Sequence, residues 1–178
     1  MELDKLKYPI GKFQYTESAT AEQIKMWISQ IEALPEKLIA TVHQLTEAQL
    51  DTPYRPQGWT VRQVIHHIAD SHANACIRFP LALTEDNPVI KPYQEELWAE
   101  LEFQKKLPIS NSLQLIKLLH QRWVVLLNTM TEKDFARTYK HPQYGKEYSL
   151  TEALGLYAWH SNHHLAHITN LIDRNFDL

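Results

Sequence analysis

The sequence predicts an all-α protein: a four-helix bundle with long connections and a small hairpin before the last helix. Three observations support this fold class. Apolar residues recur at intervals of three and four in four long segments, helix-start residues precede these segments, and the chain of 178 residues has only four glycines. So few glycines argue against a β-rich fold and against a glycine-rich phosphate loop. We interpret residues 1–178 as one domain with a single core, because this length suits one domain and no linker or repeat divides it.

The first long helix is expected over residues 20–42, after an irregular N-terminal arm over residues 1–19. Its apolar positions repeat with helical spacing. Pro35 interrupts this pattern and should kink or loosen the helix. Thr46 opens a capping-box pattern, which predicts a short helical turn.

The second long helix is expected to begin at Thr60, a good N-cap, and to reach about Pro80. A further short helix is expected around residues 95–101. The apolar stripe of the second helix comprises Val61, Val64, Ile65, Ile68, His72, Ala75, Cys76 and Phe79.

The third long helix is expected after Pro108, with Ser110 or Ser112 as its cap, and should end near Met130. Residues 135–148 hold three tyrosines and a Pro-Gln-Tyr-Gly turn, which predict a small β-hairpin or an extended loop.

The last helix is expected over residues 150–173, because Ser149 and Glu152 form a second capping-box pattern. This helix and the second one are rich in histidine. They hold seven of the ten histidines of the chain: His66, His67, His72, His160, His163, His164 and His167.

Two of these histidines, His160 and His164, are four residues apart, so a helix places them on nearly the same face. With one histidine from another helix they would make three neutral nitrogen ligands and leave one coordination position open. That ligand count is typical of a catalytic zinc site rather than a structural one. His67 is the preferred third ligand, because it lies on the polar edge of the second helix, whereas His66 points roughly 100° away from it.

Other polar residues have more than one interpretation. His163 or His167 could substitute in the ligand set. Asp70 is either a carboxylate that orients a ligand or a solvated residue of the helix face. His120 either lines the pocket or is a buried histidine with satisfied nitrogens, and Cys76 is expected to be a buried small residue rather than a nucleophile. Four tryptophans are expected in core or dimer packing: Trp59, Trp98, Trp123 and Trp159.

The segments 58–72 and 157–168 closely resemble the two histidine motifs of the DinB-like superfamily, and most of all those of its YfiT branch, whose members are assigned as metal-dependent hydrolases. The resemblance covers nearly the whole chain. It implies a four-helix bundle in which one histidine of the second helix and two of the fourth hold a divalent metal. On this sequence those ligands are His67, His160 and His164. The resemblance also implies a homodimer.

Composition limits the partners. The formal net charge is −3, so there is no electrostatic case for binding nucleic acid or an anionic membrane. The N-terminal residues do not resemble a secretory signal, no apolar run is long enough to span a membrane, and the single cysteine fits a reducing compartment. We therefore expect a cytoplasmic protein that acts on a small molecule.

The leading functional hypothesis is a metal-dependent hydrolase with one divalent ion per chain, in which the metal activates a water and polarises a scissile carbonyl. Zinc is the favoured ion and nickel the second candidate, since three-histidine sites accept several metals. No general base is evident in the sequence. One alternative is a metal-dependent thiol S-transferase of the bacillithiol type, because DinB-like relatives include such enzymes. A non-catalytic metal- or ligand-binding bundle is the other.

Overall fold

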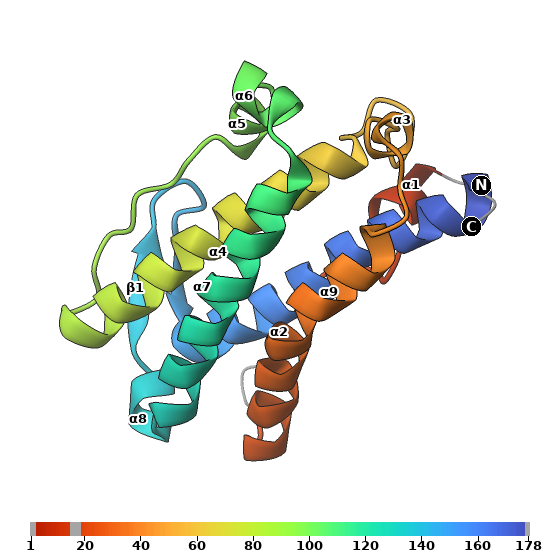
Figure 1. Ribbon diagram of the computed structural model, residues 1–178. Coiled ribbons are helices and arrows are strands. Elements are labelled where there is room, and N and C mark those ends of the chain that lie inside the picture. Colours follow the sequence, from red (N-terminus) through yellow and green to blue (C-terminus); the bar gives the residue numbers. More distant parts are fainter. Residues whose placement is uncertain (1–2, 15–18, 177–178) are drawn as a thin grey trace.

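The computed structural model describes residues 3–14 and 19–176 and confirms the predicted four-helix bundle (Figure 1). The long helices are α2 (Ala21–Val42), α4 (Val61–Thr84), α7 (Ile109–Thr129) and α9 (Leu150–Asn175). The short helices are α1 (Leu3–Lys7), α3 (Glu47–Leu50), α5 (Glu95–Ala99), α6 (Glu102–Lys106) and α8 (Glu132–Phe135). The strands β1 (Thr138–His141) and β2 (Lys146–Ser149) form the antiparallel hairpin that precedes α9.

Hydroxyl side chains fix where several helices begin. Each of five caps accepts a hydrogen bond from the backbone N–H three residues further on: Thr20, Thr46, Thr60, Thr131 and Ser149. The box predicted at Thr46 is complete. At Ser149 only half of it is recorded, since the carboxylate of Glu152 pairs with Lys146 of the hairpin.

Two local predictions were wrong. No side chain caps α7, which begins directly after Pro108, and Ser112 lies inside the helix, where His66 contacts its hydroxyl. The N-terminal arm is not wholly irregular, because residues 3–7 form α1; residues 15–18 of that arm lie outside the described residues. The short helix expected around residues 95–101 is confirmed as α5, and a second short helix that was not expected, α6, follows it directly.

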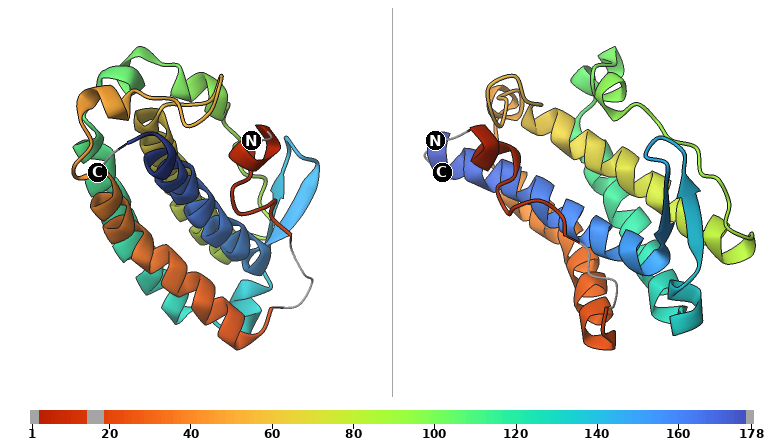
Figure 2. Two further views of the ribbon diagram at one scale, coloured as in Figure 1. Left: turned by 90° about the vertical axis from the view of Figure 1, so that its right-hand side faces the viewer. Right: turned by 180° about the vertical axis from the view of Figure 1, so that it is seen from behind.

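The bundle is not a simple up-and-down arrangement. Helices α4 and α7 are parallel, because the residue numbers of contacting pairs increase along both helices: His66 contacts Ser112, and Phe79 contacts Trp123. Helices α4 and α9 are antiparallel, because the residue numbers of contacting pairs change in opposite directions: His67 contacts His160, whereas Arg78 contacts Tyr157. Helix α2 packs against α7 and α9 (Figures 1 and 2). At Gly155 an added Cβ would lie only 3.1 Å from the Trp27 ring, so glycine permits the close approach of α9 to α2.

The parallel pair requires a long return connection from the end of α4 to the start of α7. This connection, residues 85–108, first runs beside the hairpin, where Ile90 N–H donates to the Lys140 carbonyl. It then passes over α4 and carries α5 and α6 (Figure 1). The connection thereby places the carboxylate of Glu95 beside His67 of α4.

The apolar core is divided into two clusters by a layer of histidines. One cluster contains Ile31, Phe79, Trp123 and Leu154. The other contains Leu38, Ile65, Ile116 and Ile168. On α4, α7 and α9 the residues between the two clusters include His72, His120 and His164, all of them buried. The bundle therefore has a polar layer across its interior, at the level of the candidate site.

Helix α2 continues through Pro35. Proline has no N–H, so the carbonyl of Ile31, four residues earlier, loses its usual partner within the helix. His120 Nδ1 on α7 donates to this carbonyl at 2.5 Å. At Pro35 the expected loosening is therefore the loss of one hydrogen bond within α2, and a hydrogen bond from α7 replaces it at the Ile31 carbonyl.

None of the helices in the described part of the chain is long and apolar enough to cross a membrane.

Candidate metal centre

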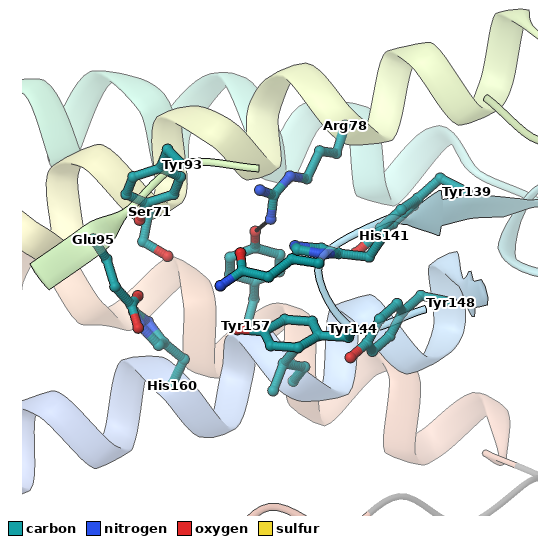
Figure 3. A pocket seen from close by; sticks show the side chains of 12 residues that line it. Ser71, Arg78, Tyr93, Glu95, Tyr139, His141, Tyr144, Tyr148, Tyr157 and His160 are labelled. Atoms are coloured by element: carbon teal, nitrogen blue, oxygen red, sulfur yellow. Dashed lines mark hydrogen bonds between the residues drawn. The ribbon is translucent and has the colours of Figure 1, made fainter. Parts of the chain in front are cut away.

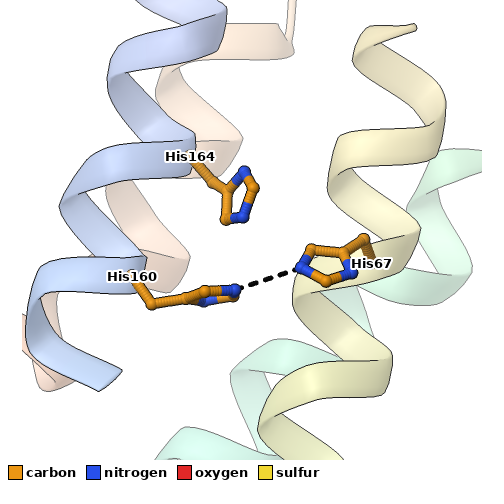
Figure 4. A group of neighbouring side chains, drawn as sticks. All are labelled: His67, His160 and His164. Carbon is orange, nitrogen blue, oxygen red and sulfur yellow. Dashed lines mark hydrogen bonds between the residues drawn. The ribbon is translucent and has the colours of Figure 1, made fainter. Parts of the chain in front are cut away.

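The three histidines selected from the sequence lie together between α4 and α9 (Figure 4). His160 and His164 extend from α9 toward His67 on α4, and one ring nitrogen of each lies within 4.8 Å of the others. His67 Nε2 and His160 Nε2 are 3.1 Å apart. The i, i+4 spacing on α9 produces this arrangement, because it returns the second imidazole to the same face one turn later.

A chain of hydrogen bonds fixes the tautomer of His160. It begins at the Ile31 carbonyl, which can only accept, so His120 carries its proton on Nδ1. The His120 Nε2 lone pair then accepts from His72 Nδ1 at 2.7 Å. The His72 Nε2 lone pair in turn accepts from His160 Nδ1 at 3.2 Å. In neutral rings this order leaves the lone pair of His160 on Nε2, which faces His67 Nε2 at 3.1 Å.

A second, shorter chain fixes His164 in the same way. His167 Nε2 donates to the Lys7 carbonyl of α1 at 3.1 Å, so its Nδ1 is an acceptor. His164 Nδ1 lies 3.3 Å from that atom and donates to it. The lone pair of His164 is therefore on Nε2. Both α9 histidines thus have their second nitrogen oriented by a neighbour, as is usual for histidines that ligate metals.

These tautomers fit a divalent ion. Two nitrogen ligands of a tetrahedral ion with bonds of about 2.0–2.1 Å lie roughly 3.3 Å apart, close to the His67–His160 separation. A second group, His163, His164 and His167, is also close enough to be considered. It fits less well, because the His167 Nδ1 lone pair is already used by His164.

The layer is electrically neutral, as ligation requires. Burial lowers the pKa of His72, His160 and His164 well below the ordinary value. Burial also lowers the pKa of His67 to about 3 and that of His120 to about 4. Neighbouring imidazoles add to the effect at His67, because a charge on one ring disfavours a charge on the next.

Two residues beside the cluster were not identified as site residues from the sequence. The carboxylate of Glu95, on α5, lies 3.9 Å from His67 Nε2 and is half-exposed. Burial raises the pKa of the Glu95 carboxyl, Glu96 adds to this, and Arg78 opposes it. The ring of Trp59 lies 4.6 Å from that of His67, so Trp59 borders the site rather than serving only as packing.

Two hollows meet at the cluster. One, of about 220 Å³, reaches His160, and the other, of about 550 Å³, reaches His164 and Trp59. Glu95 lines both. A small molecule therefore has access to the centre from two sides.

Four other residues considered from the sequence lie outside the candidate ligand set. His66 is directed away from the centre, with its nitrogens at Ser112 and at the Leu107 carbonyl. Asp70 accepts from Gln104 and has no recorded contact with a candidate ligand, so it does not orient one. His120 is a buried histidine with both nitrogens bonded. Burial raises the pKa of the Cys76 thiol to about 11, which suits a packing residue.

The hydrogen-bond chain on His160 leads to a prediction. The change His72→Phe removes the acceptor of His160 Nδ1–H, and we expect a fall of about 10- to 100-fold in metal affinity with helicity retained. His72→Gln, which offers a carbonyl in place of the ring nitrogen, should recover part of the affinity. Competition titration against a zinc indicator measures both. Nitrogen-15 spectra of the metal-free protein should show His160 protonated on Nδ1. Unchanged affinity in His72→Phe would refute the orienting role.

The fold and the site together define a helical bundle with a cluster of three histidines between two of its long helices. The chain belongs to the DinB superfamily, whose family model matches residues 30–168. A protein of Bacillus pumilus (strain SAFR-032) with the name "Putative metal-dependent hydrolase" is 55% identical over 170 residues, which cover 96% of this chain and 97% of the relative.

Solved structures share this fold. YfiT from Bacillus subtilis, described as a probable metal-dependent hydrolase with an unusual four-helix bundle topology, matches with a TM-score of 0.94 and 51% identity. The match covers 96% of this chain and 97% of YfiT. A mycothiol-dependent maleylpyruvate isomerase matches with a TM-score of 0.61 and 16% identity, over 78% of this chain and 57% of the isomerase. At that identity the likeness shows a shared fold alone.

Proposed function

We propose that this protein is a metal-dependent hydrolase that holds one divalent ion on His67, His160 and His164. The observation that carries the proposal is the shared direction of the His160 and His164 lone pairs, each fixed by a hydrogen-bond chain that ends on a backbone carbonyl. The names of the close relatives support the same class. Zinc suits an all-nitrogen site with one open position, and nickel is the second candidate.

When bound, such an ion would acidify a water and polarise a carbonyl. The chain supplies the other parts of the reaction. The carboxylate of Glu95, beside His67, is placed to accept a proton from an attacking water and to return it to a leaving group. Trp59 covers one side of the cluster and limits access of bulk water. The substrate is a small molecule, because the hollows at the site are small. The homodimer expected from the family resemblance stays a prediction.

An activity screen tests the proposal. Metal-free and zinc-reconstituted protein are compared on activated esters and amides, and in parallel on thiols offered with an electrophile. We expect metal-dependent hydrolysis of an ester or amide. Turnover only of thiol pairs would replace hydrolysis with thiol transfer, and no turnover of either class with stoichiometric metal present would favour a binding protein.

The proton-acceptor role of Glu95 can be tested separately. Glu95→Gln should lower kcat about 100-fold or more while metal affinity is unchanged, because the amide cannot accept a proton. Glu102→Gln, at an exposed glutamate of α6 that pairs with Lys106, is the matched control and should keep kcat near that of the wild type. If Glu95→Gln instead lost the metal, Glu95 would be a ligand rather than a proton acceptor.

A further inference from the structure

The residues that line the cavity beside His160 are not explained by the activation of a water for hydrolysis alone (Figure 3). Its volume is about 220 Å³. Its walls come from α4, the connection 85–108, the hairpin and α9. Besides Glu95 and His160 it is lined mainly by aromatic and polar side chains: Ser71, Arg78, Tyr93, Tyr139, His141, Gln143, Tyr144, Tyr148 and Tyr157.

The guanidinium of Arg78 is the main feature of this cavity. Arg78 is only 9% exposed, and among the described residues its guanidinium donates a single hydrogen bond, to the Tyr157 hydroxyl at 3.0 Å. Within the described part of the chain no carboxylate forms an ion pair with it. A guanidinium has five N–H donors, so most of them are without a protein partner. A buried charge in this state is unfavourable unless an anion is supplied.

A second unpartnered group lines the same cavity. His141, on β1, is 7% exposed, and its Nδ1 has no hydrogen-bond partner among the described residues. Its ring is stacked on Tyr144, with ring centroids 4.5 Å apart, so the ring is held in place rather than free to turn. Arg78 therefore has N–H groups without a protein partner at the cavity, whereas the His141 Nδ1 is fully covered and the His141 ring forms part of the cavity wall.

We propose that Arg78 binds the carboxylate of a small planar substrate, with the Tyr157 hydroxyl as an additional hydrogen-bonding group. The proposal rests on the proposed function, because it places the rest of the substrate toward His160 and Glu95, which line the same cavity. A guanidinium fork matches a carboxylate with two parallel hydrogen bonds. The rings of Tyr139, Tyr144 and Tyr148 supply walls for a flat apolar body.

The charge of the cavity favours a monoanion. Glu95 is the one carboxylate among the described residues that line it, and its charge interacts with that of Arg78. A carboxylate brings a single negative charge near Glu95, whereas a phosphate monoester brings nearly two. The substrate class we infer is therefore a small carboxylic acid that carries the hydrolysed bond at its other end.

The test uses benzoate and its neutral isostere benzamide as probes, on chelated full-length protein so that the metal cannot bind the carboxylate. Isothermal titration should show benzoate binding at least tenfold tighter than benzamide. Arg78→Met should remove this preference, and Arg78→Lys, which restores the charge without the fork, should recover part of it. Arg122→Met removes an exposed arginine of α7 and should leave both affinities unchanged.

Equal affinities of the wild type for benzoate and benzamide would overturn the proposal. This comparison needs no variant, so the proposal can be tested even if Arg78→Met does not fold. Undiminished benzoate preference in a folded Arg78→Met protein would also overturn it. Failure of the protein to bind zinc would overturn only the proposed function, because the benzoate comparison is made without metal.

Discussion

Replacing His164 with alanine should abolish stoichiometric metal binding, and His67→Ala and His160→Ala should do the same. Each change removes one of only three nitrogen ligands, so we expect metal affinity to fall by more than about 100-fold, beyond the loss seen when a supporting residue is removed. Metal content after dialysis against a known free zinc concentration measures the effect. Circular dichroism on the same samples checks that each variant is folded.

The controls come from the neighbouring histidines. His66→Ala removes the imidazole next to His67, but that ring is bonded to Ser112 on the other side of α4, so metal content should be unchanged. His163→Ala should also keep the metal, since its ring is stacked on Trp159 and lies outside the proposed ligand set. If His163→Ala lost the metal while His67→Ala kept it, the ligands would be His163, His164 and His167 instead.

Acid should unfold the metal-free protein between about pH 6 and 5, although chelation at neutral pH should leave the bundle folded on its two apolar clusters. Burial lowers the pKa of His66 and, more strongly, that of seven other histidines of the bundle: His67, His72, His120, His160, His163, His164 and His167. In the unfolded chain their pKa values are near 6.5. As the pH falls through that value, the unfolded chain takes up protons that the folded protein excludes, so the free energy of unfolding decreases.

The size of this effect is large. At pH 5.5 each histidine that stays neutral in the folded state but titrates near 6.5 in the unfolded state costs about 1.4 kcal/mol. Seven of them cost roughly 10 kcal/mol, which is comparable with the whole stability of a domain. Bound metal should shift the transition to lower pH, because protons must then displace it.

Circular dichroism across a pH series, with and without zinc, measures this transition. His43→Gln, at an exposed histidine beyond the end of α2, should leave the midpoint unchanged. A metal-free protein that kept full helicity at pH 4.5 would contradict the account, since the folded bundle would then accommodate the protons on its histidine layer.

Local patterns were sufficient to predict the long helices and to select three histidines that the fold brings close together. Their signals are short in sequence: apolar periodicity, the Thr60 cap, and the spacing of His160 and His164. What the sequence did not reveal depends on contacts between distant segments. Glu95 reaches the site only because the parallel pair α4 and α7 requires a long return connection. Nothing near Glu95 in the sequence indicates this.

The hydrogen-bond chains that orient His160 and His164 could not be predicted from the sequence either, because they join residues of different helices. Pro35 was recognised as a disturbance of α2, but its consequence, an Ile31 carbonyl free to accept from His120, depends on the packing of α7 against α2. Arg78 likewise lies one residue before Phe79 of the apolar stripe, and only the hairpin and α9 enclose its side chain. A histidine-rich helix indicates ligands, whereas the residues that orient those ligands are identified by the fold.

The most direct test of the three-histidine centre is element-resolved metal analysis of the full chain purified without an affinity tag, followed by titration of the chelated protein with zinc and with nickel. The account predicts about one divalent ion per chain, released on chelation and taken up again in a one-to-one ratio. A protein that carries no stoichiometric ion and binds neither zinc nor nickel after chelation would contradict it.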